Sequence, residues 1–156
     1  MIVVLAILGV LSAVAIVSYG YVKETGRTKV SAAQLSEARL LMQRARDREQ
    51  ATLAEIVGGA GSAAACRQNP LPPVTRLTGA CKAAWDQVNL RLGPYAGSQQ
   101  AAAQAMTDGA ARPILVDARE AGCPGGGIDT LTSVHPTGAR GKPVQQVQLA
   151  RSGYGC

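Results

Sequence analysis

The first 22 residues of this chain contain no charged side chain, and residues 1–17 are almost continuous hydrocarbon, MIVVLAILGVLSAVAIV. Residues 23–57 then become rich in charge while keeping a helical spacing of apolar positions. We therefore expect one helix with an apolar half, 1–22, and an amphipathic half, 23–57. Such a helix spans about 85 Å. A head built from the remaining residues, 58–156, is too small to bury that length.

A buried face is predicted along the amphipathic half, because apolar or small side chains recur there at three- and four-residue steps. Its members are Leu35, Ala38, Met42, Ala45, Thr52 and Ile56, with Glu49 as a discordant position. Arginines such as Arg44, Arg46 and Arg48 alternate with acids and are expected on a solvated or subunit-facing surface. Two i,i+3 ion pairs are expected among them, Arg44 with Asp47 and Arg46 with Glu49.

Three interpretations compete for the apolar segment. A secretory signal peptide has a basic region before its apolar stretch, whereas the first basic residue here is Lys23. A membrane anchor needs about 20 apolar residues, and this segment is long enough. The flanking Lys23, Arg27 and Lys29 would then place the rest of the chain in the cytoplasm. The cysteines of the chain argue for the opposite side.

The four cysteines all lie beyond the apolar segment, at Cys66, Cys81, Cys123 and Cys156. An even number behind a membrane segment favours two disulfides formed outside the cytoplasm. Spacing favours Cys66–Cys81 and Cys123–Cys156, although four cysteines allow three pairings and the sequence does not choose among them. The bridges would compensate for a thin core, because the chain has no Phe and only 3% aromatic residues.

The head shows two helical and three extended patterns. Helices are expected over 82–92 and, in an Ala-rich stretch, over 98–106. Within the first of them, Trp85, Val88 and Leu92 fall on one face. Extended segments are expected over 113–118, 128–134 and 144–150, the last two with the alternation of a half-buried antiparallel sheet. These patterns predict an α+β fold, with a small sheet laid against a long helix.

The apolar string with its central Gly9, the small cluster 12–15 and Tyr19, followed by a long polar helix, resembles the N-terminus of type IV pilins and type II secretion pseudopilins. The resemblance covers roughly residues 1–55. In that family a basic leader ends in glycine, and a glutamate follows near the mature start. Neither has a counterpart here, so we expect the mature start to lie upstream of Met1. The proline usual in the family is replaced by Val17.

The resemblance implies a pilin-like fold, with a C-terminal region that the Cys123–Cys156 bond would close. It implies a structural subunit that waits as a single-pass protein in the inner membrane. An assembly machinery then extracts it into a homo-oligomeric helical filament on the cell surface, without a cofactor. The residues expected to pack in the filament core are Ile2, Val3, Leu5, Ile7, Leu8, Gly9, Leu11, Val14 and Ile16.

Other functions stay open beside this one. A type II secretion pseudopilin, forming a short periplasmic piston, would share the fold. A net charge of +6 admits a competence pilin that binds DNA, although aromatic partners for single-stranded DNA are few and scattered. A membrane-anchored periplasmic enzyme or binding module belongs to a different class.

Catalytic and metal-binding patterns are weak. The single histidine, His135, lies in a turn-like Ser-Val-His-Pro sequence, and no Gly-x-Ser-x-Gly motif accompanies it. We therefore expect no enzymatic activity. Asp117, Glu120 and Asp129 surround a Gly-rich stretch and could approach one another to bind Ca²⁺, but their spacing matches no calcium template.

Overall fold

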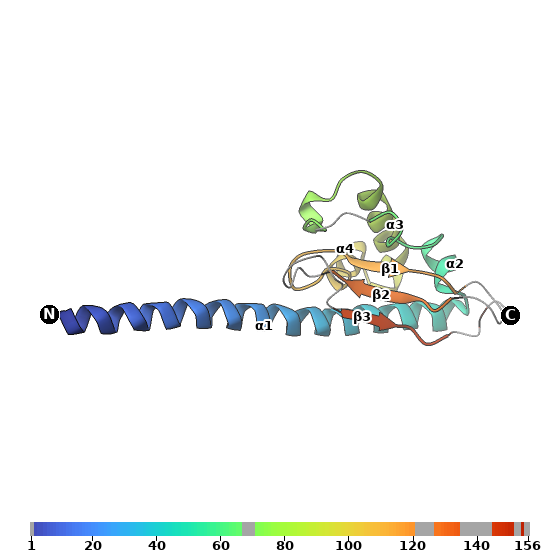
Figure 1. The fold of residues 1–156 in the computed structure, drawn as a ribbon. Coiled ribbons are helices and arrows are strands. Elements are labelled where there is room, and N and C mark those ends of the chain that lie inside the picture. Colours follow the sequence, from blue (N-terminus) through green and yellow to red (C-terminus); the bar gives the residue numbers. More distant parts are fainter. Residues whose placement is uncertain (1, 67–70, 121–126, 135–144, 152–153, 155–156) are drawn as a thin grey trace.

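The computed structural model describes residues 2–66, 71–120, 127–134, 145–151 and 154; within the first helix, the side chains of 2–17, 20, 21, 24, 27 and 28 lie outside that description. Helix α1 runs from Ile2 to Glu49, 48 residues, or about 72 Å. The other elements lie against one side of its C-terminal half, whereas its N-terminal half extends away from them (Figure 1). We call the folded part the head.

The long helix ends eight residues before the predicted boundary at Val57. Gln50 adopts a positive φ of 53°, and the chain restarts at Thr52, the N-cap of helix α2, Leu53–Val57. The Thr52 side chain accepts a hydrogen bond from the Glu55 backbone, and the Glu55 carboxylate accepts from the Thr52 backbone at 2.8 Å. This reciprocal capping box satisfies backbone groups that a continuous helix would pair internally. The expected single helix over 1–57 is therefore two helices.

Two further helices belong to the head. Helix α3 spans Gly79–Ala96 and α4 spans Gln99–Ala105, close to the predicted segments. Between them Gly97 has a φ of 88°, and the Ser98 side chain accepts from the Ala101 amide at 3.0 Å. This combination of a left-handed residue and an N-cap turns the chain sharply between the helices. A short 3₁₀ helix, Val74–Arg76, precedes α3.

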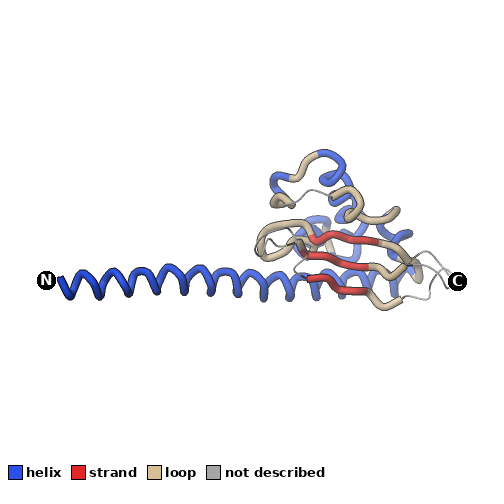
Figure 2. Tube along the Cα trace, in the orientation of Figure 1, coloured by secondary structure: helices blue, strands red, loops and turns tan. Residues whose placement is uncertain are grey.

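The sheet has three antiparallel strands in the order β1-β2-β3, with bounds Ile114–Asp117, Thr130–Ser133 and Gln145–Gln148. Each strand falls within a segment predicted to be extended. Leu131 in the middle strand is opposite Val116 on one side and Val147 on the other. Figure 2 shows the three strands beside the C-terminal half of α1. The described residues thus confirm an α+β fold with a long helix and a small antiparallel sheet.

The outer edge of β1 is covered by the segment that follows α2. The amides of Ala63 and Ala118 donate to the carbonyls of Val116 and Ala60, at 2.9 and 3.0 Å. Gly61 makes this approach possible, since its φ is +82° and an added Cβ would lie 2.4 Å from the Val116 carbonyl oxygen. The edge of the sheet is therefore protected by backbone pairing.

Two apolar clusters hold the head together. The larger joins α1, α2, α3, α4 and the sheet, and its fully buried side chains include Leu35, Met42, Leu53, Leu92, Ile114 and Leu131. All six positions predicted for the buried face of the amphipathic half are buried. The smaller cluster lies under the connector between α2 and α3 and contains Cys66, Leu71, Leu77, Cys81, Trp85 and Leu115. Trp85, Val88 and Leu92 are all buried, as predicted for α3.

A disulfide joins Cys66 to Cys81 inside the smaller cluster. It closes the connector onto the start of α3 and confirms one of the two pairings favoured by spacing. The second pairing, Cys123–Cys156, lies outside the described residues.

Candidate assembly surface

The head covers α1 only from Ser31 onward, among the side chains that the structure describes. Ser31 is fully buried, and its hydroxyl accepts a hydrogen bond from the Gly109 amide at 3.2 Å. Before it the described side chains are exposed or, at Thr25, half-buried. The loop after α4 therefore marks where the helix leaves the head.

The predicted filament-core residues, from Ile2 to Ile16, all lie on this projecting part of α1. Their backbone is helical and continuous with the head-bound part, and the helix passes the expected boundary between 22 and 23 without a break. Their side chains are outside the described set. Among the residues that the structure describes, no helix combines the length and the apolar character needed to cross a membrane.

An exposed apolar face runs along α1 from the projecting part to the head. Tyr19, Val22, Val30 and Leu40 are 70, 66, 48 and 50% exposed. With the exposed Gly26 and Ala33, the first five positions follow one another at three- and four-residue steps, and Leu40 follows two turns after Ala33. The six residues therefore share one side of the helix, and the exposed Glu37 lies between the last two of them. We call this set the seam; its members are Tyr19, Val22, Gly26, Val30, Ala33 and Leu40. Sequence reasoning missed it, although its periodic spacing was a signal for a second apolar face.

The seam ends at a hollow of about 250 Å³ between α1, the end of α3 and α4. Glu37, Leu40 and Arg44 line it from α1, and Tyr95, Ala101 and Ala105 line it from the head. The lining residues from α4, Ala101 and Ala105, have small side chains. The seam therefore passes from an open helix surface into a surface that the head flanks on one side.

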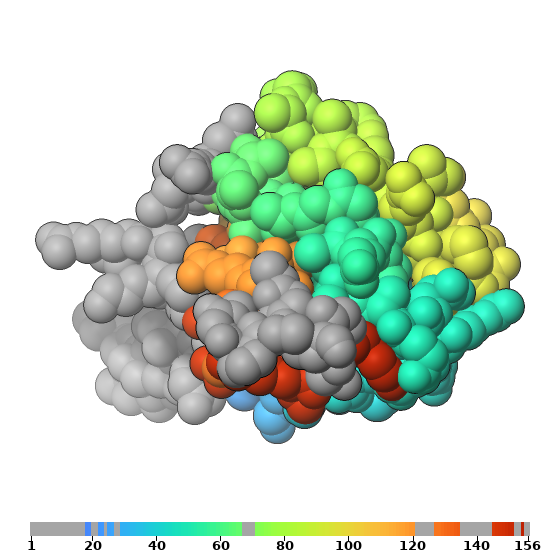
Figure 3. Space-filling model, turned by 90° about the vertical axis from the view of Figure 1, so that its right-hand side faces the viewer, coloured from blue at the N-terminus to red at the C-terminus, as the bar shows by residue number. Residues whose placement is uncertain are grey.

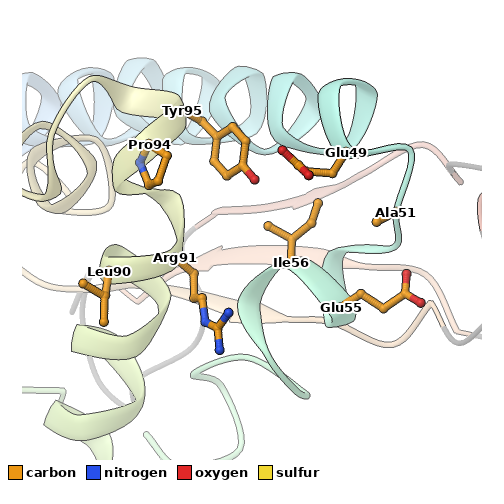
Figure 4. Close-up of a pocket in the computed structure, with 8 residues that line it drawn as sticks. All are labelled: Glu49, Ala51, Glu55, Ile56, Leu90, Arg91, Pro94 and Tyr95. Atoms are coloured by element: carbon orange, nitrogen blue, oxygen red, sulfur yellow. The ribbon is translucent and has the colours of Figure 1, made fainter.

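A second hollow, of about 360 Å³, lies on the other side of Tyr95 between α1, α2 and α3. Figure 4 shows the Tyr95 hydroxyl directed toward Glu49, with Ile56 and Arg91 across the hollow. Burial raises the pKa of Tyr95, and the hydrogen bond to Glu49 and its negative charge raise it further. The Arg48 guanidinium lies 5.9 Å from the centre of the ring. Figure 3, which looks onto this end of the head, shows the teal end of α1 and α2 beside α3.

Arg46, expected on a solvated or subunit-facing surface, is buried. Its guanidinium donates to the Glu120 carboxylate at 2.8 Å, and the two side chains are 4 and 9% exposed. Arg46 thus pairs with a residue 74 positions away rather than with Glu49. Asp129, just before β2, holds the backbone of the segment after β1 that carries Glu120. One of its carboxylate oxygens accepts from the Arg119 and Glu120 amides, each at 2.7 Å.

The three acidic residues considered for Ca²⁺ have separate roles. Asp117 pairs with Arg119 at 2.7 Å, Glu120 pairs with Arg46, and Asp129 accepts backbone amides. In the described part of the chain no group of three His, Cys, Asp or Glu residues could hold a metal ion.

The residues considered for catalysis do not form a site in the described structure. Ser133 is buried and donates to the Asp108 carboxylate at 3.0 Å, which ties β2 to the turn before β1. His135 lies outside the described residues. No family model, curated protein or solved structure matches this chain.

Proposed function

We propose that this chain is a pilin-like structural subunit of an extracellular filament that polymerises through the projecting part of α1. The observation that carries the proposal is the division of α1. Its described side chains become buried only from Ser31 onward, while about 30 residues of helix, of which residues 2–22 are uncharged, extend beyond the head. An isolated helix with such a surface needs lipid or other chains around it.

The proposed cycle follows from the two environments available to this segment. Before assembly the apolar part resides in the inner membrane, and an assembly machinery then extracts it. In the filament the same side chains pack against copies of themselves. Exchange of lipid for protein around these side chains changes the hydrophobic free energy little. Close packing and polar contacts therefore decide whether the step is favourable. Outside the membrane, each Å² of buried apolar area contributes roughly 25 cal/mol.

Electron microscopy of material sheared from the cell surface tests the proposal. We expect helical filaments that contain this chain, as shown by mass spectrometry of the same fraction. Replacement of Leu8 by Asp should abolish the filaments, because a carboxylate would enter an apolar helix core. Replacement of Leu90 by Asp is the matched control, since Leu90 is 60% exposed on α3 and far from the projecting part. A detergent-extracted monomer and no filament would contradict the proposal.

A further inference from the structure

The seam on α1 combines large and small side chains and is accompanied by two charged residues, a set that suits a second copy of the same helix. Tyr19, Val22, Val30 and Leu40 are large, and Gly26 and Ala33 are small. Lys23 lies beside the first part of the seam, and Glu37 lies on the seam itself, between Ala33 and Leu40; both are exposed. The head leaves all of these positions exposed, so folding of one chain does not account for their pattern.

Gly26 is the residue least explained by the single chain. A glycine within a helix costs about 1 kcal/mol relative to alanine, and an added Cβ at Gly26 would meet nothing within 4 Å. The fold of one copy therefore has no steric need for glycine at this position. A small residue on an exposed helix face allows another helix to approach closely.

We propose that two copies pack their α1 helices side by side in parallel, with an axial stagger of fourteen residues, about 21 Å. This inference rests on the proposed function and specifies the contact between subunits. Segment 18–30 of one copy, the guest, lies on segment 32–44 of the other, the host. The guest Lys23 then meets the host Glu37, the guest Gly26 meets the host Leu40, and the guest Tyr19 meets the host Ala33.

This stagger satisfies size and charge together, and the neighbouring choices do not. Without a stagger, Lys23 meets Lys23 and Glu37 meets Glu37, so like charges face each other. A stagger of seven residues matches Tyr19 with Gly26 and Ala33 with Leu40, but it sets Gly26 against Ala33. It also places Lys23 and Glu37 each against Val30. An antiparallel pair that matches Gly26 with Ala33 sets Tyr19 against Leu40 and Val22 against Glu37. Of the four arrangements compared, only the fourteen-residue stagger places a cation opposite an anion while it sets Gly26 and Ala33 opposite large side chains.

The hollow at the end of the seam fits this arrangement. At a stagger of fourteen, the guest Val30 lies opposite the host Arg44, which lines the hollow together with Leu40 and Ala101. A volume of about 250 Å³ admits side chains of a neighbour but not a helix, whose diameter is about 10 Å. The guest helix thus lies on the rim, and its side chains enter.

Cysteine pairs in the full-length chain measure the register directly in sheared filaments. The variant Lys23→Cys with Glu37→Cys should form disulfide-linked ladders on non-reducing gels. Lys23→Cys with Val30→Cys forms ladders if the stagger is seven residues. Lys23→Cys alone forms ladders if there is no stagger, and it also controls for disulfide exchange with the native cysteines. Ladders from either of these, in place of the first, overturn the inference and leave the proposed function standing.

Charge reversal provides an independent test. Lys23→Glu and Glu37→Lys should each lower the yield of sheared filaments several-fold, and the double variant should restore it. The unfolding midpoint of all three should match the parent chain, because the two positions are exposed. A double variant whose filament yield is as low as that of the single variants overturns the inference. If the parent chain forms no filament at all, the proposed function fails as well, and the two failures are thereby distinguished.

Discussion

The buried pair of Arg46 and Glu120 is the contact in the head that depends most on both partners being present. It joins α1 to the segment after β1, and both side chains are almost fully removed from water. Burial of two charges costs free energy that their attraction and hydrogen bonds must offset. Loss of one partner leaves the other charge desolvated. The pair therefore contributes more to the choice of this packing than to net stability.

Replacement of Glu120 by Gln should destabilise the head by about 3–5 kcal/mol, because Arg46 would remain buried without a counter-ion. Replacement of both residues, Arg46→Met with Glu120→Leu, should cost much less than the sum of the single changes. Urea unfolding followed by circular dichroism measures both. Arg44→Met is the control, since Arg44 is exposed on the same helix and should change stability by less than about 0.5 kcal/mol. Additive costs would mean that the pair is not coupled.

The capping box at Thr52 gives a second prediction, which depends on pH. The backbone amide of Thr52 and then its hydroxyl donate to the Glu55 carboxylate and lower the pKa of Glu55. A carboxyl with a lowered pKa adds stability above its ordinary pKa, and that stability is lost as pH falls through the lowered value. Glu55→Gln should therefore be less stable than the parent chain at neutral pH and equal to it in acid. Unfolding midpoints at the two pH values test this, and a constant difference would contradict it.

At the scale of elements, local patterns predicted the structure where the signal was itself local. The strands and both helices of the head lie within a few residues of their predicted bounds, because period-two and period-3.6 patterns are read from neighbours in sequence. The end of α1 was missed although Thr52-Leu53-Ala54-Glu55 carries the capping-box signature. The periodicity of Thr52 and Ile56 continued across the break and concealed it.

The contacts that build the site were less accessible from sequence. Arg46 and Glu120 are 74 positions apart, and no local pattern indicates that one arginine of several is buried against one glutamate. The residues of the seam recur at helical spacing in the sequence. However, its meaning depends on which face of α1 the head covers, and that is decided by tertiary packing.

Helix α3 offers a matched pair of leucines for testing how its buried face contributes. Leu92 is fully buried in the larger cluster, whereas Leu90 is 60% exposed. Leu92→Ala should cost about 2–5 kcal/mol through lost burial and the cavity that remains. Leu90→Ala should change the free energy of unfolding by less than about 0.5 kcal/mol. Chemical denaturation of both variants measures the difference, and similar costs would show that α3 is not anchored as described.

At the scale of the whole molecule, the proposed function requires one continuous helix to serve two environments. Its second half supplies a wall of the head's core through Leu35, Ala38 and Met42, and its first half carries the apolar sequence. Because the two halves are one continuous helix, no loop separates the projecting part from the part that the head covers.

Separation of these two roles predicts the behaviour of a shortened chain that starts at Ser18. Described burial of α1 begins at Ser31, so removal of 1–17 should leave the head intact. Its unfolding midpoint should shift by less than about 2 °C, below the effect of 1 kcal/mol in a chain of this size. The same chain should be absent from sheared filaments, since it lacks the apolar surface that would hold it there. Scanning calorimetry measures the stability of the head, and analysis of sheared filaments measures assembly. A large drop in the midpoint would show that 1–17 packs on the head, in which case the apolar segment belongs to the folded domain and not to an assembly surface.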